Sequence, residues 1–317
     1  VPILVLGTIY KQCLVAHLLP VFEYVDRMPA FRRFAQEYIY ESPRNVDFFA
    51  TQLLFVVQFS GAMALVWYWQ LAYGTLPWWL IGVYVCSFVG LGARGMGAIY
   101  SLSHKEAHNP KLYKPWIRNT VGNLFENWLG VFNGGVPNNF TTTHMSLHHR
   151  LDSGIGDTLY CWDINRSSWV EFMMYVARGF LHQSGFAGLY QFTTSQRKFD
   201  RANAWKLGRG VVAYWVIVPA VILWSTSSLK FYFFIVLEPL TCMGWFLALI
   251  NLGFHAFIEN DEHGCRIKCV ESCTLLGGND DYFGENDHMA HHNAGHVHHR
   301  DLLEHQERQG KEWARHK

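Results

Sequence analysis

The sequence predicts an all-α integral membrane protein with four transmembrane helices arranged in two hairpins. Half of the 317 residues are hydrophobic and only 16% are charged, well below the roughly 25% usual in soluble proteins. Four apolar segments are each close to the ~20 residues that a helix needs to cross a bilayer. They lie at about residues 46–71, 78–102, 208–225 and 231–251. Very short connections join the first to the second and the third to the fourth, so each pair is expected to form a hairpin.

The first hairpin follows an N-terminal segment, residues 1–45, that we expect to lie at the membrane interface. Its apolar stretch is interrupted by polar residues such as Lys11 and Glu23, so it is too broken for a span and fits an interfacial helix better. The first span ends in the aromatic run 67–69, which is typical of the belt of Trp and Tyr at a membrane surface.

The segments outside the spans are more polar. Within the long connection between the hairpins, residues 169–190 predict an amphipathic helix on the membrane surface. After the fourth span the chain is polar again and ends in a polar tail, residues 300–317. We expect residues 1–317 to form a single domain. The formal net charge of +1 gives no indication of a nucleic-acid-binding surface.

Histidine is the outlier of the composition, with 17 residues, and eight of these form three clusters. The clusters are His104 and His108; His144, His148 and His149; and His288, His291 and His292. On an α-helix, residues three or four apart share a face, so each cluster should present two or three imidazoles in one direction. In the second cluster this spacing pairs His144 with His148 and turns His149 about a quarter-turn away.

Asn251 and His255 form a fourth candidate element where the fourth span leaves the membrane. Alone, the pair would be a polar helix end at the level of the lipid headgroups, but beside three histidine clusters we interpret it as part of a metal site. Neutral imidazole is the commonest metal ligand, and the histidines exceed what one ion needs, so two metals are expected. Ligand sets of nitrogen alone suit iron or another redox metal. Two zinc ions remain an alternative.

The expected hairpins place all of these clusters on one face of the membrane. The hairpin tips together hold only one basic residue, Lys230, whereas the other extramembrane segments hold many. By the positive-inside rule, the histidine face is a cap on the cytosolic or matrix-like side. The membrane would be the endoplasmic reticulum or the inner membrane of an organelle, a mitochondrion or a plastid.

The pattern HxxxH at 104–108, HxxxHH at 144–149 and HxxHH at 288–292 resembles the histidine boxes of the membrane fatty acid desaturase and hydroxylase superfamily. Residues 251–255 are similar to the Asn-xxx-His segment of acyl-CoA desaturases. That similarity implies that His255 binds iron and that Asn251 binds it through water. The resemblance implies a helical membrane domain under a cap that holds a non-haem di-iron centre.

The activity that this resemblance implies is oxygen-dependent desaturation of a fatty acyl chain. The two electrons would come from a separate cytochrome b5 or ferredoxin, because the sequence has no cytochrome b5 signature. A hydroxylase of alkyl or sphingoid chains would use the same boxes. A third alternative is a desaturase-like subunit of a larger membrane complex. His296, His298 and His299 extend the third cluster beyond the usual box, and we expect them to support the ligands or to lie on the surface.

Overall fold

The computed structural model describes residues 24–89, 94–195, 198–255, 272–274 and 283–313. Within these ranges every regular element is a helix, and the single β-bridge joins Tyr40 to Tyr113. The all-α prediction is therefore confirmed. The chain forms two compact units, of which the first comprises residues 1–137 and 212–239, and the second comprises 138–211 and 240–317. The expected single domain stays a prediction.

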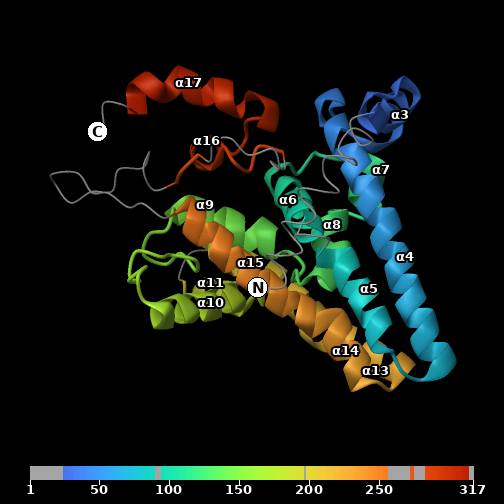
Figure 1. Ribbon diagram of the computed structural model, residues 1–317. Helices are drawn as coiled ribbons and strands as arrows, with labels where there is room; N and C mark the ends of the chain where they lie inside the picture. Colours follow the sequence, from blue (N-terminus) through green and yellow to red (C-terminus); the bar gives the residue numbers. More distant parts are fainter. Residues whose placement is uncertain (1–23, 90–93, 196–197, 256–271, 275–282, 314–317) are drawn as a thin grey trace. The chain divides into compact units, whose positions relative to one another are not determined.

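Helices α4 (Phe49–Tyr73) and α5 (Trp78–Val89) of the first unit lie side by side, in blue and cyan in Figure 1. The apolar sequence of α4 ends at Gly74, whose φ of 73° is a left-handed conformation that costs glycine little. The N–H of Gly74 donates to Gln70 O, which satisfies a carbonyl of the last turn. The chain therefore turns sharply before α5 begins.

A second turn of the first unit packs against this one. Lys230, on α14 (Leu229–Tyr232), donates from Nζ to Leu76 O over 2.6 Å, and its ammonium lies 4.5 Å from the ring centre of Trp78. The only basic residue of the two predicted hairpin tips thus joins one tip to the other.

Three helical runs are long and apolar enough to cross a membrane: Pro43–Tyr73, Asp200–Thr226 and Leu229–Phe254. They correspond to the predicted first, third and fourth spans. The predicted second span, 78–102, is occupied by α5 and by α6 (Arg94–His108), and residues 90–93 between them lie outside the described part of the chain. The described residues therefore contain three candidate membrane helices, with a shorter apolar helix at Trp78–Ser87.

The other helices of the first unit are short and complete the bundle around α4, α5 and α6. They are α3 (Pro29–Phe34), η2 (Ala35–Ile39), η3 (Pro43–Phe48), α7 (Pro115–Thr120), α8 (Leu124–Asn127), η5 (Leu129–Asn133), η7 (Ala213–Ile217), α13 (Val218–Thr226) and η8 (Phe233–Leu237). Of the expected N-terminal interfacial segment, residues 1–23 lie outside the described residues.

The second unit is built from helices that carry or support the second and third histidine clusters. They are η6 (Phe140–His148), α9 (His149–Leu151), α10 (Trp169–Gln183), α11 (Phe186–Thr194), α12 (Lys198–Val212), α15 (Glu238–Phe254), α16 (His288–Asn293), η10 (His299–Asp301) and α17 (Leu302–Trp313). Figure 1 shows α10 and α11 in yellow-green and α16 and α17 in orange to red.

Helix α10 packs closely on α15. A Cβ atom at Gly179 would lie 3.0 Å from Gly244 O and 3.2 Å from the Cβ of Ala248, so a larger residue would push the two helices apart by a few tenths of an ångström. On the opposite side, Val170 and Met174 are exposed, which suits a helix in contact with lipid. The helix expected over residues 169–190 is present as two helices, α10 and α11, which are separated at residues 184–185.

The predicted polar tail contains a helix, α17, which we did not expect. Its first residue, Leu302, is fully buried, while Leu303 is exposed. The segment after the third histidine cluster is thus anchored to the second unit by an apolar side chain.

Candidate metal centre

The second histidine cluster lies on a π-helix rather than on the expected α-helix. Hydrogen bonds in η6 span five residues, and α9 begins directly at His149. This register brings together His144 and His149, five positions apart, with their Nε2 atoms 2.9 Å from each other. The expected pairing of His144 with His148 is therefore replaced, because His148 joins a different group.

Four histidines of the second unit form a group that we call the tetrad: His148, His255, His288 and His292. One ring nitrogen of each lies within 4.8 Å of one from every other member. His255 follows the last residue of α15, and its Nε2 lies 3.1 Å from Nε2 of His288 on α16. Three of the four residues are buried, and the side chain of the fourth, His292, is only 3% exposed. Three separate parts of the chain thus direct imidazoles to one point.

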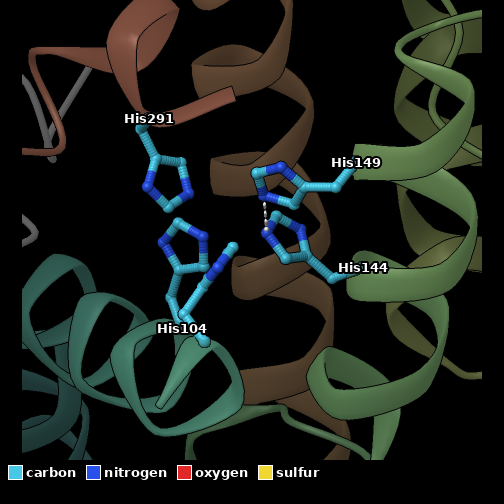
Figure 2. A group of neighbouring side chains, drawn as sticks. His104, His144, His149 and His291 are labelled. Carbon is cyan, nitrogen blue, oxygen red and sulfur yellow. Dashed lines mark hydrogen bonds between the residues drawn. The ribbon is translucent and has the colours of Figure 1, made fainter. Parts of the chain in front are cut away.

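A second group of the same unit, which we call the trio, consists of His144, His149 and His291. Their ring nitrogens also lie within 4.8 Å of one another, and Figure 2 shows the three rings turned toward a common centre. The ring of His149 stacks on that of His292, with the ring centres 4.3 Å apart, so the trio adjoins the tetrad. In each pair of adjacent histidines, one residue therefore belongs to each group. His148 and His292 belong to the tetrad, and His149 and His291 belong to the trio.

The first histidine cluster belongs to the first unit. His104 and His108 lie on α6, four residues apart, and their ring centres are 4.7 Å from each other. His104 is buried and His108 is half-buried. As expected, the two histidines therefore lie on the same face of α6.

Two aspartates that the sequence analysis missed hold members of the tetrad in place. Asp157 Oδ2 lies 2.9 Å from Nδ1 of His148, and Asp152 Oδ1 lies 3.0 Å from Nδ1 of His292. Carboxylates in contact with the second nitrogen of a ligating imidazole commonly fix its tautomer and orientation. In both histidines the contact occupies Nδ1 and leaves Nε2 as the nitrogen available to a metal.

The backbone after α9 places these carboxylates. Asp152 and Ser153 both have left-handed conformations, with φ of 50° and 59°, which non-glycine residues rarely adopt. Such strain is found at functional sites, where surrounding contacts maintain it. Here the turn brings the Ser153 N–H to Asp157 Oδ2, and Leu159 N–H donates to Oδ1, both over 2.9 Å.

These contacts determine the protonation of the Asp157–His148 pair. Burial opposes ionisation of Asp157, but the His148 imidazole and the Leu159 N–H hold its pKa below the usual range. Burial likewise opposes protonation of His148. The nearby Asp157 carboxylate favours the protonated form more strongly than burial opposes it, so the pKa of His148 is raised. Because an ionised carboxylate only accepts hydrogen bonds, His148 donates from Nδ1.

Asn251 lies one turn before His255 on α15 and is buried. Its amide nitrogen donates to Leu159 O over 3.0 Å and to the hydroxyl of Tyr175 over 2.6 Å. Asn251 thus joins α15 to the segment that carries Asp157. Its expected role as a ligand through water stays a prediction.

The additional histidines lie apart from both groups of the second unit. His298 Nδ1 accepts from Arg300 N over 3.4 Å at the start of η10, and its ring lies against that of His299. His296 is exposed. None of the three belongs to the tetrad or the trio.

The tetrad and the trio fit metal ions by chemistry and by spacing. All seven donors are imidazole nitrogens, a set that suits iron, zinc and other transition metals. Two nitrogens that bind one ion at a nitrogen–metal–nitrogen angle of about 90°, each about 2.1 Å from the ion, are about 3.0 Å apart. The observed separations of 2.9 Å in the trio and 3.1 Å in the tetrad match this value.

A family model described as fatty acid desaturase matches residues 77–317, about three quarters of the chain. The chain belongs to the fatty acid desaturase family. The resemblance drawn from the histidine boxes is thereby confirmed, and the matched region contains every candidate ligand. Comparisons with curated proteins and with solved structures found no match. Membership of this family identifies the chain as an oxidoreductase with a membrane context.

Proposed function

We propose that this member of the fatty acid desaturase family is an oxygen-dependent membrane fatty acyl desaturase with two histidine-bound irons. The observation that carries the proposal is the tetrad beside the trio, two groups of nitrogen ligands in contact through His149 and His292. A single structural zinc site would need only four ligands and commonly includes cysteine. Seven imidazoles in two adjoining groups suit a centre with two ions.

In this proposal the tetrad binds one iron, with Asn251 contributing through water, and the trio binds the other. Three nitrogens leave positions open on an ion, and His104 and His108 of the first unit would supply further ligands there. The support for this pair is its shared face on α6 and the burial of His104. When bound, two irons supply the activation of O2 that removes hydrogens from an unactivated methylene.

The protein's own residues prepare the site for that chemistry. Asp157 and Asp152 orient His148 and His292, so their Nε2 atoms need no rearrangement to bind a metal. Burial of His148 and His255 keeps water from these ligands. The electrons come, in this proposal, from a separate cytochrome b5 or ferredoxin.

The proposed membrane arrangement has four spans in two hairpins, with the second span formed around α5. The histidine groups lie on the cytosolic or matrix-like side of the endoplasmic reticulum or of an organelle inner membrane. Two features support it: three helical runs are long and apolar enough to cross a bilayer, and Lys230 is the only basic residue of the connecting turns.

The test is to express the chain in a host with a simple lipid composition and to determine the new lipids by mass spectrometry. New double bonds, with about two irons per purified chain, are the expected result. A hydroxylated chain would assign the hydroxylase alternative. His148→Ala or His291→Ala should abolish the product and lower the iron content, whereas His305→Ala, outside both groups, should do neither. Full activity in either of the first two variants would overturn the proposal.

A further inference from the structure

Glu106 lies between His104 and His108 in the sequence and is almost completely buried, with 1% of its surface exposed. At about 100° per residue, it lies about 180° around α6 from the midpoint of the two histidines. Its side chain therefore projects from the face of α6 opposite to the candidate ligands. This carboxylate has no part in the function proposed above.

The Glu106 carboxylate is surrounded by donors from other parts of the first unit. The N–H of Phe125 donates to Oε1 over 3.1 Å and to Oε2 over 2.9 Å, and the N–H of Glu126 donates to Oε2 over 2.9 Å. The hydroxyl of Tyr113 donates to Oε1. Glu106 is thus attached to the first turn of α8 and to the segment before α7.

The network continues from Tyr113 to α4. Gln52 Nε2 donates to the Tyr113 hydroxyl over 2.8 Å, and the Tyr40 hydroxyl donates to Gln52 Oε1. All of these side chains are buried. A chain of buried hydrogen bonds therefore runs from Tyr40 through α4 to α6, and each lost bond would leave a buried polar group unsatisfied.

These bonds define the rotation of α6 about its axis. A side chain ends about 6 Å from the axis of a helix, so a rotation of about 10° moves its tip by about 1 Å. Metal ligands must be held to within about 0.5 Å of their working positions. Small changes in the attachment of Glu106 would consequently displace both imidazoles.

We propose that Glu106 is a positioning residue for the metal ligands His104 and His108, acting through its hydrogen bonds to α8 and Tyr113. This inference rests on the proposed function, since it assumes that the pair binds iron. It assigns to Glu106 neither contact with the metal nor a part in the reaction.

The test compares Glu106→Gln with the wild-type chain and with Asp47→Asn, all purified at full length in detergent. Glutamine keeps the shape of Glu106 but turns an NH2 group toward donors. Asp47 is a matched control, because it is a buried carboxylate of the same unit that pairs with Arg32 over 3.2 Å. Iron per chain is measured under chelator competition, and the two irons are distinguished by Mössbauer spectroscopy.

The expected result is that Glu106→Gln holds one iron about 10- to 100-fold more weakly and alters one of two Mössbauer signals. Asp47→Asn should keep both signals, even if its Tm falls equally. Unchanged iron retention and spectrum in Glu106→Gln would overturn the inference, as would equal iron loss in both variants.

If Glu106→Gln does not fold, Tyr113→Phe tests the same point, because it removes one donor and keeps the carboxylate. It should weaken the same iron by a smaller factor, and wild-type retention would contradict the inference. A wild-type chain that binds no iron would instead refute the proposed function itself.

Discussion

Asp157 offers the sharpest test of how this chain prepares a metal ligand. The carboxylate is 2% exposed and accepts from His148 Nδ1, Ser153 N and Leu159 N, each over 2.9 Å. Asparagine at position 157 has one acceptor oxygen and one NH2 donor. The substitution Asp157→Asn therefore cannot satisfy all three donors.

Either orientation of the new amide has a definite cost. If its oxygen faces Leu159 N, the NH2 group faces His148, whose Nδ1 must then accept, so the proton moves to Nε2 and blocks the ligating atom. If its oxygen faces His148, the NH2 group faces Leu159 N, and an unsatisfied buried donor costs about 1–3 kcal/mol. We expect metal binding at the tetrad to weaken about 10- to 100-fold, or about 1.4–2.7 kcal/mol.

The assay is iron retention by the purified chain against a graded series of chelator concentrations, together with desaturation in the host. Asp163→Asn is the matched control, because Asp163 pairs with Arg178 over 2.8 Å on the surface of the same unit and belongs to neither histidine group. The control should retain iron like the wild type. Iron retention in Asp157→Asn equal to that of the control would refute the orienting role.

Three further outcomes are expected. Gly179→Ala should destabilise the chain by about 1–3 kcal/mol through overpacking, measured as a lower Tm in detergent. Gly82→Ala is the control, because there is open space around its Cβ position, and it should not lower the Tm. Equal Tm values for the two variants would contradict the close packing at Gly179. Tyr175→Phe should lower stability by about 1–2 kcal/mol, because Asn251 and Leu159 lose a partner; an unchanged Tm would contradict this. Removing metal should lower the Tm of the wild type more than that of His148→Ala, which lacks a ligand of the tetrad; an equal fall in both would show that His148 does not bind the metal.

Much of the fold could be predicted because hydrophobicity over about 20 residues is a local property. The three membrane-length runs agree with the first, third and fourth predicted spans. The second span could not be settled in this way, since α5 is short and α6 is only weakly apolar before it becomes polar at Ser103 and His104. The helix α17 was also missed, because a polar sequence with a single buried leucine resembles a tail until its packing is known.

The candidate ligands were accessible from the sequence, but their division into two groups was not. Spacing alone assigned His148 to the same face as His144, because an α-helix was assumed. In the π-helix η6, His144 instead lies on the same face as His149, and His148 points to the other histidines of the tetrad. A helix register depends on the packing around it, and no residue spacing reveals it.

The supporting aspartates could have been found from a simpler signal. Asp152 and Asp157 follow His149 within eight residues, and carboxylates near ligating histidines commonly contact their second nitrogen. What the sequence could not show is which histidine each one contacts. Asp157 contacts His148 of the preceding cluster, while Asp152 contacts His292, 140 residues away. One short turn thus orients ligands from two distant boxes, so substitutions in that turn should weaken iron binding, though less than the loss of a ligand from the boxes themselves.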